Sequence, residues 1–132
     1  MAVPRPGVQE RILLHLRDYV DHADKVEVPF ALSQMGIANA VAIARSNVPR
    51  AIAGMREQGH LIERQAHVTG VSRKRKAYFL TEEGANIADD IWSKVSTQPV
   101  RLIHQDGHSE TLNLAQALES TDLPLRHVDF LR

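Results

Sequence analysis

The sequence predicts a mixed α+β fold in which helices dominate the first half and short hairpins follow. Apolar residues recur at helical spacing between Val8 and Gln58. Gly59 then stops the helical pattern, two strand-like runs flank a basic turn, and Thr81 opens a further helix. With 132 residues, the chain is near the usual size of one domain and is long enough to bury a core.

Composition excludes several classes of protein. The chain contains no cysteine, which excludes disulfide scaffolds, thiolate zinc sites and cysteine nucleophiles. Residues 1–7 lack the apolar core of a secretory signal, and no apolar run approaches the roughly 20 residues of a membrane-spanning helix. We therefore expect a cytoplasmic protein with no membrane partner, led by a disordered segment over residues 1–7.

Charge is unevenly distributed although the formal net charge is zero. The segment from Arg45 to Leu80 contains eight basic and two acidic residues, whereas the remainder contains eight basic and fourteen acidic ones. A basic centre between acidic ends focuses its field on one surface. The distribution favours a polyanionic partner.

Two short helices with a tight joint are expected after a first helix that runs from Val8 to about His22. Pro29 interrupts the pattern within a short extended piece. Ser33 is a plausible N-cap for a helix over 34–41 that points Ile37 and Val41 inward, and residues 42–43 make the joint.

The helix after the joint is predicted to run from Arg45 or Ser46 to Gln58 and to end at Gly59. Pro49 falls near its first turn, where a missing N–H costs little. Its inward stripe consists of Val48, Ile52 and Met55.

A basic hairpin is predicted next. Its strands begin at residues 60–64 and cover 76–80, and residues 69–75 form a flexible, strongly basic tip. Thr81 caps a following helix that ends near Ser96, with Ile87, Ile91 and Val95 on its apolar stripe.

Residues 97–132 are expected to form a small appendix. Asp106-Gly107 marks a hairpin turn. A two-residue turn would pair Leu102 with Thr111, whereas an odd loop pairs Leu102 with Leu112 and Val100 with Leu114. The second register keeps apolar pairs on one face and is preferred. A short helix over 114–118 and a tail with helical spacing follow.

The appendix carries more apolar side chains than about 35 residues can bury alone. They must pack on the preceding domain, on a second copy of the chain or on a further partner. We favour packing within the chain together with a symmetric dimer contact. The apolar residues concerned are Val100, Leu102, Leu112, Leu114, Leu118, Leu125, Val128 and Leu131.

The order helix, short helix, joint, helix, basic hairpin, helix is that of a winged helix-turn-helix. Residues 32–52 resemble the helix-turn-helix of archaeal winged-helix regulators, in which a Gly-Leu-Ile-Glu strand start follows, matched here by residues 59–63. The run Leu80-Thr81-Glu82-Glu83-Gly84 is also similar to that of MarR-like proteins. The resemblance covers about residues 8–96. It implies a DNA-binding domain there and leaves 97–132 for dimerisation or docking.

In some archaeal members of that group, such a module heads a longer chain with an ATPase or a helical-repeat region. Residues 100–118 resemble the small hairpin that can follow the module there. The present sequence contains neither a Gly-rich phosphate loop nor a helical repeat. Both a stand-alone regulator and the first module of a longer one fit the pattern.

Base readout is assigned to Ser46, Asn47 and Arg50, which share the exposed face of the second motif helix. Arg50 can donate two parallel hydrogen bonds to guanine, and Asn47 suits adenine or a phosphate. Ala53 and Gly54 leave room for the helix to approach DNA. Phosphate contacts are predicted for Ser33, Gln34, Arg45, Arg64, Arg73, Lys74, Arg75 and Lys76.

Other interpretations stand beside this one. Ser46, Asn47 and Arg50 would also suit a merely solvated helix face, and the whole module could be a protein-docking domain. His104, Asp106 and His108 are residue types that can bind a metal, but the hairpin turn separates them. A hydrated turn is therefore favoured over a metal site. No residue pattern indicates a nucleophile with its base, so we predict a non-enzymatic transcription regulator that binds double-stranded DNA, as a homodimer, without metal or cofactor.

Overall fold

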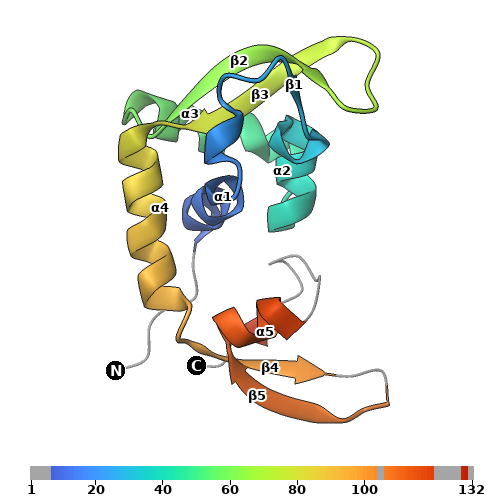
Figure 1. Ribbon diagram of the computed structural model, residues 1–132, viewed down its shortest axis with the longest axis vertical. Helices are drawn as coiled ribbons and strands as arrows, with labels where there is room; N and C mark the ends of the chain where they lie inside the picture. Colours follow the sequence, from blue (N-terminus) through green and yellow to red (C-terminus); the bar gives the residue numbers. More distant parts are fainter. Residues whose placement is uncertain (1–6, 104–105, 121–128, 131–132) are drawn as a thin grey trace.

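The computed structural model describes residues 7–103, 106–120 and 129–130. The wing hairpin lies at one end of the molecule and a second small sheet at the other, with the helices between them (Figure 1). The helices are α1 Val8–Arg17, α2 Gln34–Val41, α3 Val48–Glu57, α4 Glu82–Val95 and α5 Leu114–Ser120. The strands are β1 Glu27–Val28, β2 Leu61–Val68, β3 Lys74–Leu80, β4 Pro99–Ile103, β5 Ser109–Asn113 and β6 Asp129–Phe130, and single 3-10 turns, η1 to η3, cover Val20–His22, Phe30–Leu32 and Arg45–Asn47.

The first helix is shorter than predicted. It ends at Arg17, and the expected continuation to His22 is replaced by the separate turn η1. The N–H of Tyr19 donates to the carbonyl of Leu16 at 3.0 Å, which closes the helix with a tighter i→i+3 bond. The Tyr19 ring then packs against the rings of His15 and His22.

Helix α2 begins and ends as predicted. The Ser33 hydroxyl caps it by accepting the Gly36 N–H at 3.1 Å, and Ile37 and Val41 are fully buried. At the joint, Ala42 adopts φ +59°, a left-handed conformation that only a small fraction of non-glycine residues occupy. The reversal lets α3 pack across α2.

Helix α3 begins later than predicted, at Val48, because the residues before it form η3. Pro49 has no N–H to donate to the Arg45 carbonyl, so the first turn is instead closed by the i→i+3 bond from Val48 to Arg45. The predicted inward stripe of Val48, Ile52 and Met55 is confirmed as buried.

The wing consists of β2 and β3 in an antiparallel ladder, with β1 parallel to β2 on its outer side. Both strands are longer than predicted, because the ladder extends to the pair His67 and Lys74. Of the expected tip over residues 69–75, only the last two residues are strand, and residues 69–73 form the connection between the strands. Lys74, Arg75 and Lys76 lie on β3, and only Arg73 precedes it.

Helix α4 is capped by the predicted Thr81, whose hydroxyl accepts the Gly84 N–H at 3.0 Å. A Cβ at Gly84 would lie 1.9 Å from the His60 carbonyl oxygen, so this position requires glycine. The last helical residue is Val95, which agrees with the expected end near Ser96.

The main core joins α1, α2, α3 and the wing, while a second cluster joins the C-terminal sheet to α1 and α4. In the second cluster Leu14 and Val95 bury Val100 and Leu114. The expected packing of this segment within the chain is confirmed for these residues. Among the described residues, none of the helices combines the length and the apolar composition that a membrane span requires.

The register predicted for the C-terminal hairpin is wrong. Val100 pairs with Leu112 and Leu102 with Glu110, because β4 and β5 join through a longer loop containing Gly107 at φ +88°. Leu114, predicted to pair with Val100, instead begins α5. Asp129–Phe130 form β6 against β4 rather than the predicted helix. Leu125, Val128 and Leu131 lie outside the described residues.

Candidate nucleic-acid interface

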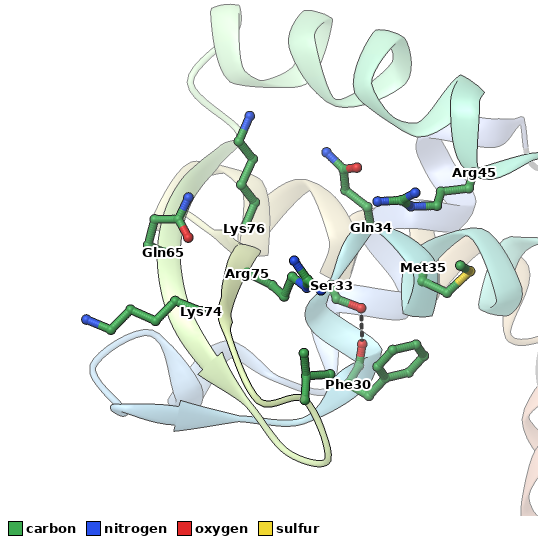
Figure 2. Close-up of a pocket in the computed structure, with 10 residues that line it drawn as sticks. Phe30, Ser33, Gln34, Met35, Arg45, Gln65, Lys74, Arg75 and Lys76 are labelled. Carbon is green, nitrogen blue, oxygen red and sulfur yellow. Dashed lines mark hydrogen bonds between the residues drawn. The ribbon is translucent and has the colours of Figure 1, made fainter.

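An open groove of about 630 Å³ separates the wing from the start of α2 and the turn before α3. In Figure 2 the strand side chains approach it from one side and those of η2, α2 and Arg45 from the other. Four of its residues are cations. Its lining consists of Phe30, Ser33, Gln34, Met35, Arg45, Gln65, Val71, Lys74, Arg75 and Lys76.

Strand alternation sorts the wing cations onto two faces. Lys74 and Lys76 share one face of β3 with Tyr78, while Arg75 and Ala77 point to the other. Within the described part of the chain, Lys74, Arg75, Lys76 and Arg45 form no ion pair. The groove therefore carries concentrated, uncompensated positive charge.

The predicted reading residues are exposed beside this groove rather than in it. Ser46 and Asn47 belong to η3, and Arg50 lies in the first turn of α3. Ala53 is exposed as expected. Gly54 is only half-exposed, because Gln9 of α1 lies against it, so it offers less room to a ligand than predicted.

The role predicted for Ser33 in phosphate binding is not supported by its geometry. Its side chain is 5% exposed, and the hydroxyl donates to the Phe30 carbonyl at 2.6 Å while accepting the Gly36 N–H. The hydroxyl proton and the backbone N–H, which donates to the same Phe30 carbonyl at 3.0 Å, are therefore both used within the chain. Ser33 is a structural cap.

The geometry of Arg64 does not favour its predicted phosphate contact either. Its Nη2 donates to the carbonyls of Ala23 and Lys25 at 2.8 and 2.9 Å, and its guanidinium lies 4.6 Å from the centre of the Phe79 ring. Arg64 pairs with Ala77 across the ladder and does not belong to the groove lining. It therefore ties the loop before β1 to the wing and does not extend the basic groove.

A hydrogen-bonded chain that the sequence does not predict lies beneath the groove. The Gln34 amide donates to the Tyr78 hydroxyl at 2.9 Å, and that hydroxyl donates to the Glu63 carboxylate at 3.0 Å. Arg56 lies 3.6 Å from the same carboxylate. Burial raises the pKa of Tyr78, Gln34 opposes the rise and Glu63 adds to it, so the hydroxyl stays protonated near neutral pH.

The histidines and acid of the C-terminal hairpin do not form a described metal site. His104 lies outside the described residues, and the Asp106 carboxylate accepts the backbone N–H of His108 at 2.8 Å, as in a local turn. Within the ranges that the structure covers, no three or more potential ligands gather.

Comparisons with known proteins give structural but not sequence relatives. No family model and no curated protein match the chain. Its structure resembles Lactococcus lactis ZitR, a zinc-responsive MarR family member, with a TM-score of 0.50, 22% identity and coverage of 70% of this chain and 55% of ZitR.

A mutant of Staphylococcus aureus MepR is also similar, with a TM-score of 0.51, 16% identity and coverage of 68% of this chain and 58% of that one. The chain thus spans a little over half the length of the structures that it matches. At these identities the likeness concerns architecture. The chain has a mixed α+β fold that matches the winged helix of MarR-type transcription regulators.

Proposed function

We propose that this protein binds double-stranded DNA sequence-specifically and regulates transcription without catalysing a reaction. The observation that carries the proposal is the groove of unpaired cations beside an exposed helix start. Phosphates dominate the affinity of DNA-binding proteins, and a helix presented next to them supplies the base contacts.

In this proposal the sugar-phosphate backbone lies along the groove. Lys74, Lys76, Arg75 and Arg45 contact phosphates as cations, and Gln34 contributes a polar contact from the first turn of α2. Arg73, exposed just before β3, extends the same surface toward the wing tip. These contacts set the position of the protein on the duplex.

Base readout is proposed for the turn before α3 and its first turn. Val48 and Ile52, on the opposite face of α3, are buried in the core and fix the orientation of the helix. The face of α3 that carries Arg50 is therefore directed outward. Arg50 would donate to the acceptors of guanine in the major groove, with Asn47 and Ser46 contacting neighbouring bases or phosphates.

Protein docking is the alternative function, and one observation favours it. Phe30 and Met35 line the same groove with 41% and 42% of their surfaces exposed. Large exposed apolar side chains are common where proteins bind one another. A docking module would keep these two residues and the core but would not need Arg50 or the wing cations.

A salt titration separates the two functions. Binding of a labelled random-sequence duplex should weaken steeply between about 50 and 200 mM salt, because each neutralised phosphate contributes about 0.9 to the slope of log affinity against log salt. A chain that fails to bind duplex DNA at the lower salt concentration would contradict the proposed function and leave docking as the alternative.

We further propose a cytoplasmic homodimer, since paired half-sites multiply specificity. Helices α1 and α4 and residues 97–132 are the surfaces available for the contact. Residues 97–132 are the alternative docking surface for a further domain, in the case of a longer regulator of the archaeal type. Sedimentation of the whole chain tests the dimer directly.

A further inference from the structure

The Tyr78 hydroxyl lies where the wing, α2 and α3 meet. Tyr78 shares a face of β3 with Lys74 and Lys76, but it is only 1% exposed. Its hydroxyl accepts one hydrogen bond from Gln34 and donates one to Glu63, so both partners are defined. A buried hydroxyl with a defined donor and a defined acceptor fixes the position of α2 relative to the wing.

Each partner belongs to a different part of the candidate interface. Gln34 is the first residue of α2 and lines the groove, while Glu63 lies directly opposite Tyr78 on β2. Glu63 in turn faces Arg56 in the last turn of α3, at 3.6 Å. The chain Gln34–Tyr78–Glu63–Arg56 thus connects the groove floor with the helix that carries Arg50.

We propose that Tyr78 is a positioning residue for sequence readout: its hydroxyl aligns α3 with the wing so that base and phosphate contacts form on one duplex at the same time. This inference rests on the proposed DNA binding and extends it to a residue that touches no DNA. Phosphate contacts alone allow the protein to bind any duplex. Sequence readout also requires that Arg50 reaches the base edges while the wing cations contact the phosphates.

Loss of the hydroxyl should therefore reduce selectivity more than affinity in general. In Tyr78→Phe the ring still fills its buried site and every cation remains. The wing can still bind phosphates, so random DNA binds almost as before. A selected sequence loses more, because readout then requires realignment of α3 in the complex.

The experiment compares Tyr78→Phe with Tyr19→Phe, the only other tyrosine and one that does not line the groove. The probes are the duplex that the wild-type chain enriches from a random pool and an unselected duplex. Tyr78→Phe should weaken the enriched duplex about tenfold and the unselected one less than about twofold, with unchanged salt slope. Tyr19→Phe should match the wild type on both.

Glu63→Ala, which removes the acceptor of the Tyr78 hydroxyl at a residue outside the proposed DNA contacts, provides a second variant and keeps the inference testable if Tyr78→Phe does not fold. It should also lower the ratio of the two affinities, and combined with Tyr78→Phe it should lower that ratio little further, since both remove the same hydrogen bond. Circular dichroism at the binding temperature verifies folding.

Equal losses on both duplexes, or none, in the folded variants would overturn the positioning role while leaving DNA binding intact. A wild-type chain that enriches no sequence would instead contradict the proposed sequence-specific function, and the positioning role with it. The two failures are therefore distinguishable.

Discussion

The imidazole Nε2 of His15 lies 2.8 Å from the carbonyl oxygen of Ala31, which joins α1 to the turn that precedes α2. Because the partner is a carbonyl, Nε2 is the donor, and a second proton on Nδ1 would charge a half-buried ring. Burial lowers the pKa of His15, and the Ala31 hydrogen bond and the charge of Asp18 oppose that shift only in part.

The lowered pKa of His15 predicts that the free energy of unfolding decreases in mild acid. In the unfolded chain the His15 imidazole has the ordinary histidine pKa of about 6.5, and in the folded chain its pKa is lower. Between these two pKa values the unfolded chain therefore binds more protons than the folded chain. The free energy of unfolding should fall as pH is lowered through and below the pKa of the unfolded chain. His15→Gln, which retains an amide donor, should remove this part of the slope in urea titrations. An unchanged slope in His15→Gln would contradict the assignment.

The wing cations should govern affinity for all duplexes. Replacement of Arg73, Lys74, Arg75 and Lys76 by alanine should weaken binding and reduce the salt slope by about 0.9 for each phosphate that the protein no longer neutralises. Lys94→Ala, on the exposed side of α4, is the control. Fluorescence anisotropy at several salt concentrations measures both quantities, and identical slopes for the quadruple variant and the wild type would exclude the wing.

Arg50 should govern sequence preference. Arg50→Ala should cost about 1–3 kcal/mol on the preferred duplex and relax the choice at one base pair, with a smaller loss on random DNA. Arg50→Lys, which preserves charge but not the paired donors, should restore random binding more than selective binding. If both duplexes lose the same affinity, Arg50 contacts a phosphate.

Arg64 should affect stability rather than DNA binding. Arg64→Gln removes hydrogen bonds to the Ala23 and Lys25 carbonyls and should lower the free energy of unfolding by about 1–3 kcal/mol. Arg17→Gln is the matched control, since its exposed pair with Asp89 is worth under about 1 kcal/mol. A reduced salt slope with unchanged stability would return Arg64 to the DNA interface.

Most of the winged helix follows from local sequence. The Ser33 and Thr81 caps and the spacing of Val48, Ile52 and Met55 act within a few residues, so the order of the chain alone reveals them. The same holds for the hairpin of β2 and β3, whose strands are adjacent in sequence, but not for β1, which pairs with β2 from a distant part of the chain.

The side-chain roles depend on distant partners, which local sequence does not reveal. Arg64 and Arg75 are cations on the same face of the wing, but Arg64 donates to the distant carbonyls of Ala23 and Lys25, whereas Arg75 lines the groove. Likewise the hydroxyl of Tyr78 meets Gln34 across 44 positions of the chain. The predicted C-terminal register is wrong because apolar pairing does not by itself determine the length of the connecting loop.

Truncation after Ser96 tests the role of the C-terminal segment. The main core lies within residues 8–96, so the winged helix should remain folded, although Leu14 and Val95 lose their cover. We expect weaker self-association and weaker binding to the enriched duplex. Sedimentation at micromolar concentration compares both chains. A monomeric full-length chain whose DNA affinity survives truncation would point to a different partner for this segment.

Selection from a random pool of duplexes tests the central proposal most directly. Wild-type protein should enrich one sequence, and Arg50→Ala should enrich a version relaxed at one base pair while retaining most of its affinity for the unselected pool. Enrichment of no sequence by a folded wild-type chain, or identical enrichment by both proteins, would contradict readout by α3.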